Sequence, residues 1–171
     1  RRGIIDILQL MGANITLINE REVGGEPVAD IVVKSAELKG VDIPEHLVPL
    51  AIDEFPVIFV AASSASGVTK LTGAEELRVK ESDRIQVMAD GLITLGINAV
   101  PKDDGMVIVG GPMGGGEVHS HGDHRIAMAF AVASLLSNAP ITIRDCDNVN
   151  TSFPSFAALA NSTGMTIEVD E

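Results

Sequence analysis

The sequence predicts one α/β domain (α+β in some classification schemes) over residues 1–171, built from repeated units of the βαβαββ type. Two recurring patterns lead to this prediction. First, a helical stretch that ends at a glycine and is followed by a strand occurs three times, at Gly12, Gly96 and Gly164. Second, a buried helix opened by an aspartate occurs twice, and each copy is followed by a second helix entrance at the same distance.

The two aspartate-led helices begin at Asp53 and Asp123, and the next helix entrances lie 28 residues further on, at Glu81 and Thr151. The unit is therefore expected about three times, with a first copy that is truncated at its front. Short right-handed crossovers favour helices that all point the same way. We therefore expect four helix N-termini to gather on one face, where their N–H groups and partial positive charges favour anions.

The individual elements follow from hydrophobic periodicity and turn residues. Helices are expected at residues 4–11, 55–62, 82–95 and 124–136, and from Thr151 or Ser152 to about Ser162. Strands are expected at 15–18 paired with 29–33, at 68–71, at 97–100 paired with 106–109, at 141–143 and at 166–169. Pro56 is compatible with a helix because a missing N–H group costs nothing in the first turn.

The composition restricts both the class of protein and the class of partner. Of the 171 residues, 46% are hydrophobic, which suits a folded core rather than a disordered segment. The 12 Lys and Arg against 24 Asp and Glu give a formal net charge of −12, which argues against a nucleic acid or an anionic membrane surface as partner. An anionic small molecule would have to be held by a local basic cluster.

The expected location is the cytoplasm. The sequence contains no apolar run of the roughly 18 residues that a membrane-spanning helix needs, and no signal peptide precedes the first helical pattern. Cys146 is the only cysteine, so an intrachain disulfide is impossible and a reducing compartment fits. We expect its thiol to be a small buried side chain.

A first candidate site lies in the stretch from Arg78 to Arg84, which concentrates three cations in an otherwise acidic chain. Arginine suits planar carboxylates and lysine acts as a point charge, while Glu81 could work as an acid or a base. The simpler interpretation also fits the spacing. Ser82 would cap a helix, and Glu81 would form a local ion pair with Arg84.

A second candidate site contains three histidines and an aspartate, at His119, His121, Asp123 and His124, followed by Arg125. Such a cluster raises the alternative of a metal-binding domain. The loop-to-helix position favours another interpretation, in which Arg125 holds an anion and His124 donates or relays a proton. A capped helix with a solvated histidine and arginine is equally compatible with the spacing.

Two further helix entrances could also carry chemistry. Asp53 precedes a fully apolar helix, so its carboxylate either stabilises the helix dipole or serves as a general base. Thr151 and Ser152 precede Pro154, and this pattern is typical of a helix cap without any further role.

In this order and spacing, these stretches resemble the C-terminal lobe of 5-enolpyruvylshikimate-3-phosphate synthases. The matching segments are residues 52–56, 76–84, 123–128 and 151–154, and the similarity runs from Arg1 to the end of the chain. The resemblance implies an enolpyruvyl-transferase-like lobe with parallel helices. It also implies transfer of the enolpyruvyl group of phosphoenolpyruvate to the 5-hydroxyl of shikimate 3-phosphate, with release of phosphate and without a metal or organic cofactor.

The resemblance assigns two catalytic roles. Asp53 matches the residue that accepts the proton of the shikimate hydroxyl. Glu81 matches the residue that donates and accepts a proton at the methylene carbon of phosphoenolpyruvate. This division of labour suits an addition followed by an elimination.

The resemblance also implies a set of substrate-binding residues. Arg84 and Arg125 match the pair that holds the carboxylate of phosphoenolpyruvate, and Lys80 and His124 match residues near the transferred group. Thr151 stands where many relatives have a lysine that contacts phosphoenolpyruvate, although other relatives also have Thr-Ser-Phe-Pro here.

The family's N-terminal lobe, which binds the phosphate of the shikimate substrate, has no counterpart motif in these 171 residues. We therefore expect the chain to need that lobe as a partner and to be inactive, or nearly so, alone. A rival interpretation is a non-catalytic anion-binding or interaction module on the same fold. Both interpretations use Arg84 and Arg125, but only catalysis requires Asp53 and Glu81.

Overall fold

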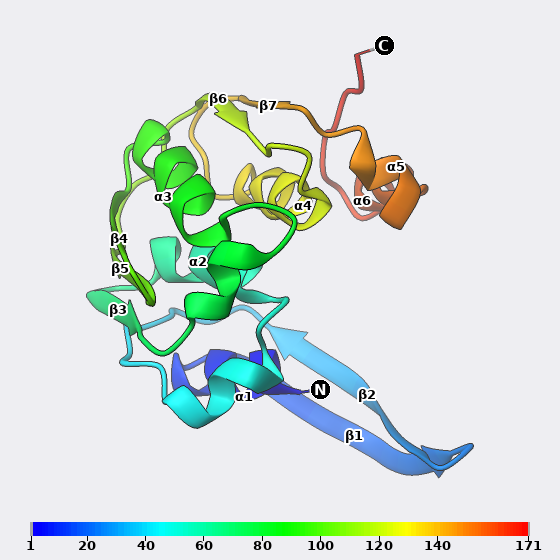
Figure 1. Ribbon diagram of the computed structural model, residues 1–171. Helices are drawn as coiled ribbons and strands as arrows, with labels where there is room; N and C mark the ends of the chain where they lie inside the picture. The colour runs from blue at the N-terminus through cyan, green and yellow to red at the C-terminus, as the bar shows by residue number, and fades with distance from the viewer. Residues whose placement is uncertain (1, 171) are drawn as a thin grey trace.

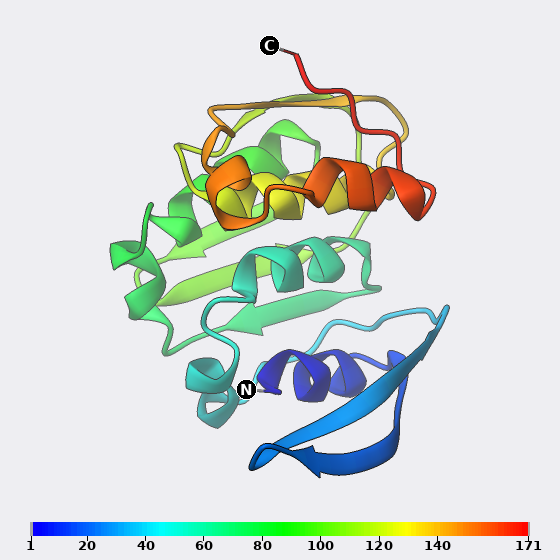
Figure 2. The same cartoon turned by 90° about the vertical axis from the view of Figure 1, so that its right-hand side faces the viewer.

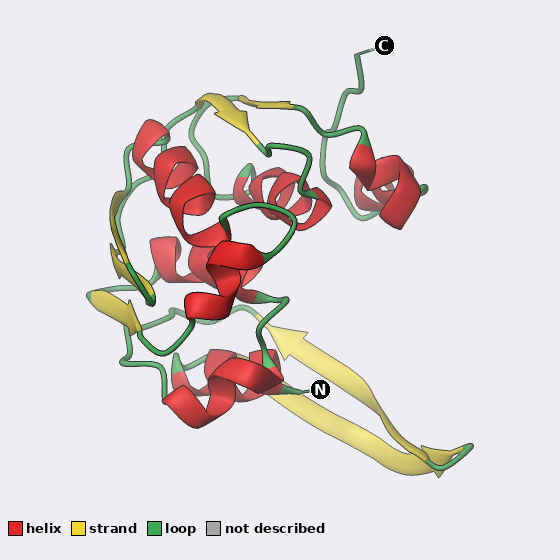
Figure 3. Cartoon of the chain, viewed as in Figure 1, coloured by secondary structure: helices red, strands yellow, loops and turns green. Residues whose placement is uncertain are grey.

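The computed structural model describes residues 2–170. Its strands lie on the outside of the molecule, and the helices α1 (Gly3–Leu10), α2 (Phe55–Ser64) and α4 (His124–Ala133) stack inside it. Figure 2, turned from the view of Figure 1, shows these helices running side by side in nearly the same direction. The strands and helices alternate as in Figure 3, which confirms the α/β prediction. In the described part, none of the helices is long and apolar enough to cross a membrane.

One βαβαββ unit is complete. Residues 39–42 run parallel to β3 (Val68–Leu71) and the residues just before it, through isolated bridges at Ser66 and Lys70. The connection between the two strands contains η1 (Glu45–Leu50) and α2. After β3 come η2 (Glu75–Val79), α3 (Arg84–Thr94), β4 (Asn98–Lys102) and β5 (Gly105–Val109). β5 lies between β3 and β4 and is antiparallel to both. This order of elements is the one that the repeat predicted.

The first copy of the unit contains only its last three elements, α1, β1 (Asn14–Val23) and β2 (Glu26–Lys34). The strands form the predicted antiparallel hairpin, longer than expected. The helix endings are also the same. Gly12 and Gly96 have φ of 92° and 88°, and the N–H group of the next residue donates to a carbonyl of the last helical turn over 2.9 Å in both copies. Gly164 ends α6 (Phe156–Ser162) in the same way.

The two hairpins differ in how much of them is covered. Val33 in β2 and Ile108 in β5 occupy equivalent positions of the two hairpins, yet Val33 is 66% exposed and Ile108 is 1% exposed. Two residues earlier in each strand the difference is the same, since Ile31 is 56% exposed and Met106 is 1% exposed. In the complete unit, β3 pairs with β5 and α2 packs against it. The hairpin of the first copy therefore presents core-type side chains that have no such cover among residues 2–170.

The third copy contains β6 (Gly116–His119), which the sequence did not predict, then α4, and β7 (Ile141–Arg144) parallel to β6. Its last helix was predicted wrongly as one segment from Thr151 or Ser152. The structure has two helices, α5 (Asn148–Ser152) and α6. Phe153 adopts φ −148° and ψ 75° between them, because a residue before proline avoids helical angles. The strand expected at 166–169 is not formed.

Three smaller predictions are also corrected. Helix α3 begins at Arg84 rather than Ser82, because the carboxylate of Asp83 caps it by accepting from the N–H group of Gln86 over 3.0 Å. Helix α4 ends at Ala133 rather than residue 136. Cys146 is exposed rather than buried.

The apolar core lies between α2, α3 and α4 and the sheet of the complete unit. Its largest fully buried side chains include those of Phe55, Phe59, Phe130, Ile58, Met88 and Leu92. Packing of this kind, at about 25 cal/mol per Å² of buried apolar area, is the main term that holds α2, α3 and α4 in one arrangement. That arrangement fixes where their N-termini meet.

Candidate functional site

The N-termini of α2, α3 and α4 meet at one place. Asp53 lies two residues before α2, Arg84 is the first residue of α3, and Asp123 is the N-cap residue of α4. Their side chains contact one another directly. The predicted gathering of helix starts is therefore observed for three of the four expected positions.

Arg84 and Asp123 form the centre of this cluster, and both side chains are fully buried. The Nε of Arg84 donates to Asp123 Oδ2 over 2.8 Å, and its Nη2 lies 3.4 Å from Oδ1. Asp123 also accepts from the N–H groups of Arg125 and Ile126, so one carboxylate caps α4 and anchors α3. Sequence spacing alone gave Asp123 no more than a capping or metal-binding role.

The environment of Asp123 shifts its acid–base equilibrium. Burial alone would raise the pKa of this carboxyl group, because it penalises the charged form. The hydrogen bond and charge of Arg84, with hydrogen bonds from Ser82 and from the N–H group of Arg125, outweigh burial and lower the pKa below the ordinary value of 3.8. Asp123 is therefore a stable anion at neutral pH and a poor candidate for a general base.

Ser82 is a functional candidate that the sequence placed wrongly. It was expected to cap α3, but its hydroxyl donates to Asp123 Oδ2 over 3.0 Å. Asp83 performs the capping instead. The only sequence signal was a hydroxyl residue close to the basic stretch, and that signal does not distinguish a cap from a contact across 41 residues.

Asp53 faces three cations. Its carboxylate oxygens lie 3.5 Å from Arg84 Nη1, 3.7 Å from Lys80 Nζ and 3.9 Å from Arg125 Nη2. Arg125 also donates from Nη1 to the backbone carbonyl of Asp53 over 3.2 Å. The structure thus brings together four of the residues predicted for the site, from three separate segments of the chain.

Glu81 joins the same cluster from its exposed side. Its Oε2 accepts from Arg84 Nη2 over 2.6 Å, while its side chain remains about half exposed. The expected local ion pair is therefore present. Glu81 and Asp123 accept from Nη2 of Arg84, and Asp53 faces Nη1. Glu81 or Asp53 must therefore move before a ligand carboxylate can bind both of these nitrogens.

The basic stretch predicted at 78–84 does not form a basic surface. Arg78 pairs with Asp83 at 2.6 Å, and Lys80 pairs with Glu76 at 2.5 Å. Arg84 pairs with three carboxylates, as described above. Local carboxylates, together with Asp53 and Asp123, therefore neutralise these cations. Arg125, half-buried at the start of α4, is the more accessible of the two arginines that face Asp53.

Two predicted binding residues stand apart from these contacts. His124 is the first residue of α4 and is half-buried beside Arg125. Thr151 is exposed in α5, which packs against α4, and its side chain makes no hydrogen bond within the part of the chain that is described. Because α5 and α6 replace the single expected helix, Thr151 does not lie at a helix start, and the expected fourth N-terminus is missing.

The alternative metal site at His119, His121, His124 and Asp123 is not formed. Within residues 2–170, no group of three His, Cys, Asp or Glu side chains is arranged to hold a metal ion. Asp123 is instead occupied by Arg84, and the rings of His119 and His121 are 6.1 Å apart.

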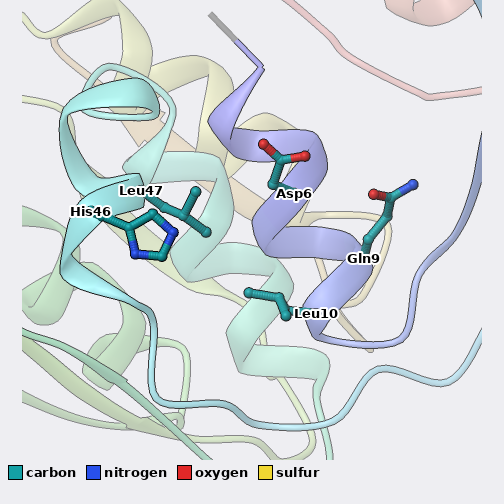
Figure 4. Close-up of a pocket in the computed structure, with 5 residues that line it drawn as sticks. All are labelled: Asp6, Gln9, Leu10, His46 and Leu47. Carbon is teal, nitrogen blue, oxygen red and sulfur yellow. The ribbon is translucent and has the colours of Figure 1, made fainter.

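Two surface depressions accompany the fold. One lies between α1 and η1, where Figure 4 shows Asp6, Gln9 and Leu10 on the helix and His46 beside Leu47 opposite them. None of the cluster residues lines it. The other is bordered by η1 and η2 and is lined by Val48, Pro49, Ile52, Gly73, Glu75, Glu76, Arg78 and Val79. Only this second depression adjoins the cluster, through Glu76 and Arg78.

Comparisons with a family model and with individual proteins point to the same family. Residues 1–159 match the model of the EPSP synthase (3-phosphoshikimate 1-carboxyvinyltransferase) family. The chain is 68% identical over 168 residues to the 3-phosphoshikimate 1-carboxyvinyltransferase of Alkalilimnicola ehrlichii, covering 98% of this chain and 38% of that protein. It is 63% identical over 169 residues to the Methylococcus capsulatus protein of the same name, covering 99% of this chain and 39% of that protein.

Solved structures agree with the sequence matches. The EPSP synthase of Acinetobacter baumannii superposes with a TM-score of 0.97 at 56% identity, covering 100% of this chain and 40% of that chain. The enolpyruvyl transferase NikO of Streptomyces tendae, at 18% identity and a TM-score of 0.66, shares the fold. The chain thus spans about 40% of the length of the relatives that it matches, and it belongs to the EPSP synthase family.

Proposed function

We propose that this chain supplies one lobe of the active site of an enolpyruvyl transferase. The reaction moves the enolpyruvyl group of phosphoenolpyruvate to the 5-hydroxyl of shikimate 3-phosphate and releases phosphate. The observation that carries the proposal is the convergence of Asp53, Lys80, Arg84 and Arg125 at three helix N-termini, with Glu81 beside them, in a chain of this family.

Two carboxylates divide the proton transfers. Asp53 accepts the proton of the 5-hydroxyl group while the hydroxyl oxygen attacks C2 of phosphoenolpyruvate. Glu81, in its protonated form, delivers a proton to the methylene carbon. The resulting tetrahedral intermediate carries a methyl group and the phosphate on the same carbon. Glu81 then removes a proton from that methyl group while the C–O bond to phosphate breaks, which restores the double bond. The proton held by Asp53 passes to the departing phosphate, so both carboxyl groups return to their starting states. The half-exposed position of Glu81 supports this role, because the group must reach substrate carbon.

The cations stabilise the negative charge of both substrates. Arg125 is half-buried and can meet the carboxylate of phosphoenolpyruvate without a large rearrangement. Arg84 joins it when that carboxylate replaces Glu81 as the partner of Nη2. The same exchange frees Glu81 for proton transfer. Lys80 lies 3.7 Å from Asp53 and adds a further cation beside the proton-accepting carboxylate.

His124 and Thr151 complete the proposed binding set. His124 follows Asp123 at the start of α4, where its ring can approach the transferred group. Thr151 belongs to α5, on the side of α4. In place of a lysine, Thr151 would contribute a hydroxyl group and no charge. Arg84 and Arg125 would then provide more of the positive charge that stabilises phosphoenolpyruvate.

The proposed domain is a single lobe, 1–171, that works with a second lobe of the intact protein. The chain spans about 38% of its relatives, so much of the binding surface for the two anionic substrates lies outside it. We propose that the other lobe binds the phosphate groups and closes over the cluster. The isolated chain is then inactive, or nearly so, although its half of the site is folded.

The decisive experiment mixes this chain with a separately produced remainder of the parent protein and measures phosphate release from phosphoenolpyruvate and shikimate 3-phosphate. Activity in the mixture and its absence from either piece are expected. Asp53→Asn and Glu81→Gln should each slow turnover by a factor of about 10² to 10⁴. Arg144→Met, in an exposed pair with Glu117, should leave turnover unchanged. A folded, associated mixture that binds phosphoenolpyruvate without releasing phosphate would identify a non-catalytic anion-binding module instead.

A further inference from the structure

Arg78 is the cation of the basic stretch that the proposed chemistry leaves without a role. Its side chain is about three-quarters buried, and all three guanidinium nitrogens donate to protein oxygens. Nε donates to the carbonyl of Asp103 over 2.8 Å, and Nη2 to the carbonyl of Lys102 over 2.5 Å. Nη1 donates to Asp83 Oδ2 over 2.6 Å. These three bonds hold the guanidinium group against the protein, which suits a structural role better than the binding of a substrate anion.

Two of the three partners of Arg78, the carbonyls of Lys102 and Asp103, lie at the turn between β4 and β5. The same turn holds the beginning of η2. The N–H group of Gly73 donates to Asp104 Oδ2 over 2.9 Å, and that of Ala74 to the carbonyl of Asp104 over 2.7 Å. The turn therefore fixes η2 at both ends. The turn belongs to the β4–β5 hairpin, and β5 also pairs with β3. The position of η2 is therefore set relative to the sheet of the complete unit.

The other end of the segment is fixed by Asp83. Its Oδ1 accepts from the N–H group of Gln86 and caps α3, while its Oδ2 accepts from Arg78. The ion pair between Arg78 and Asp83 thus closes the short segment that carries Lys80 and Glu81. Leu77 anchors the end of η2 in the core, but the residues that follow it lie at the surface, and Val79 is 79% exposed. Ser82 and Glu81 connect this segment to Asp123 and Arg84, whereas the hydrogen bonds from Arg78 connect it to the β4–β5 turn.

We infer that Arg78 is a positioning residue, which sets the place of Lys80 and Glu81 relative to Asp53 by tying their segment to the β4–β5 turn. The inference rests on the proposed function, because it assigns those two residues to the reaction. Arginine is required here because three separate N–H directions reach two carbonyls and a carboxylate at once. A lysine offers a single nitrogen and can satisfy only part of this set.

The test uses the full-length parent protein with Arg78→Met, Arg78→Lys and the control Arg144→Met. A misplacement of about 1 Å costs about 100-fold in rate. We therefore expect kcat of Arg78→Met to fall about 100-fold while KM for both substrates stays within about threefold. Arg78→Lys should recover part of the loss. Asp83→Asn keeps a capping oxygen but weakens the ion pair, and its effect should not add to that of Arg78→Met.

Amide hydrogen exchange provides a readout that does not depend on activity. Exchange should accelerate at residues 79–82 of Arg78→Met and remain unchanged in β5. Unchanged exchange at 79–82 would overturn the inference even if the parent protein proved to have no transferase activity. Faster exchange throughout β3, β4 and β5 would overturn it in favour of a general stabilising role. A large rise in KM with unchanged kcat would show that Arg78 binds substrate directly.

Discussion

Asp123 accepts a 2.8 Å hydrogen bond from Nε of Arg84, and neither side chain is exposed to solvent. The pair joins the first residue of α3 to the N-cap of α4 and, together with the packing of the helices, links the two helix starts directly. Removing two charges from water is costly, and such a pair adds little net stability over an apolar one. Its value here lies in fixing the arrangement of the site.

Breaking this pair from one side should destabilise the fold strongly. Asp123→Asn keeps an oxygen that can cap α4 but leaves Arg84 buried with less compensating charge. We expect the free energy of unfolding to fall by about 3–5 kcal/mol, measured by urea denaturation of the chain at pH 7. The control Asp30→Asn removes an exposed pair with Arg21 and should cost less than about 1 kcal/mol. Equal effects of the two substitutions would contradict this account.

The lowered pKa of Asp123 also predicts a dependence of stability on pH. A carboxyl group whose pKa is depressed in the folded state stabilises the fold at pH values above its unfolded pKa of 3.8. That contribution is lost as the pH falls below 3.8 through the lower folded-state pKa. The free energies of unfolding of the unsubstituted 171-residue chain and of Asp123→Asn, measured in urea, should therefore converge as the pH falls from about 5 towards 2. Parallel curves over this range would show that Asp123 does not contribute in this way.

The sequence predicted the parts of the fold that depend on local patterns. A glycine with positive φ ends a helix for local reasons, so Gly12, Gly96 and Gly164 marked the repeat correctly. The shared 28-residue offset, from Asp53 to Glu81 and from Asp123 to Thr151, placed the two aspartates at the same position of the unit. The structure brings both into one cluster around Arg84. Asp53, Lys80, Arg84 and Arg125 were named from the sequence and meet as expected.

The sequence could not predict contacts whose partners leave no local signal. Ser82 reaches Asp123 across 41 residues, and Arg78 donates to two backbone carbonyls, which every residue possesses. The split between α5 and α6 was a different kind of miss, because Phe153 before Pro154 disfavours helical angles and the signal was present. That split moved Thr151 away from a helix start and broke the expected fourfold pattern.

Substitution of Glu81 should separate chemistry from stability. Its carboxylate is half exposed and pairs with Arg84, so Glu81→Gln should leave the free energy of unfolding nearly unchanged. In the assembled two-lobe protein, phosphate release should slow by a factor of about 10² to 10⁴, the usual loss for an acid–base group. Glu75→Gln, an exposed neighbour in η2, is the matched control and should retain full activity. A retained rate in Glu81→Gln would remove this residue from the mechanism.

The uncovered hairpin predicts where the rest of the protein docks. Met106 and Ile108 are buried in the complete unit because β3 pairs with β5 and α2 packs over it, whereas Ile31 and Val33 at the matching positions of β2 are exposed. We expect a strand of the remaining chain to pair antiparallel with β2, followed in space by a helix that covers these two side chains. Every second N–H group of β2 points away from β1, so it can donate a hydrogen bond to such a strand.

Hydrogen exchange on the 171-residue chain and on the full-length protein checks this expectation. In the shorter chain, protection of the amides of residues 28–34 should alternate from residue to residue, and in the full-length protein both sets of amides should be protected. The amides of β5, which already has partners on both edges, should behave alike in the two proteins. Alternating protection that persists in the full-length protein would contradict the proposed strand. Full protection in the shorter chain that disappears on dilution would show that a second copy of the chain covers β2 instead.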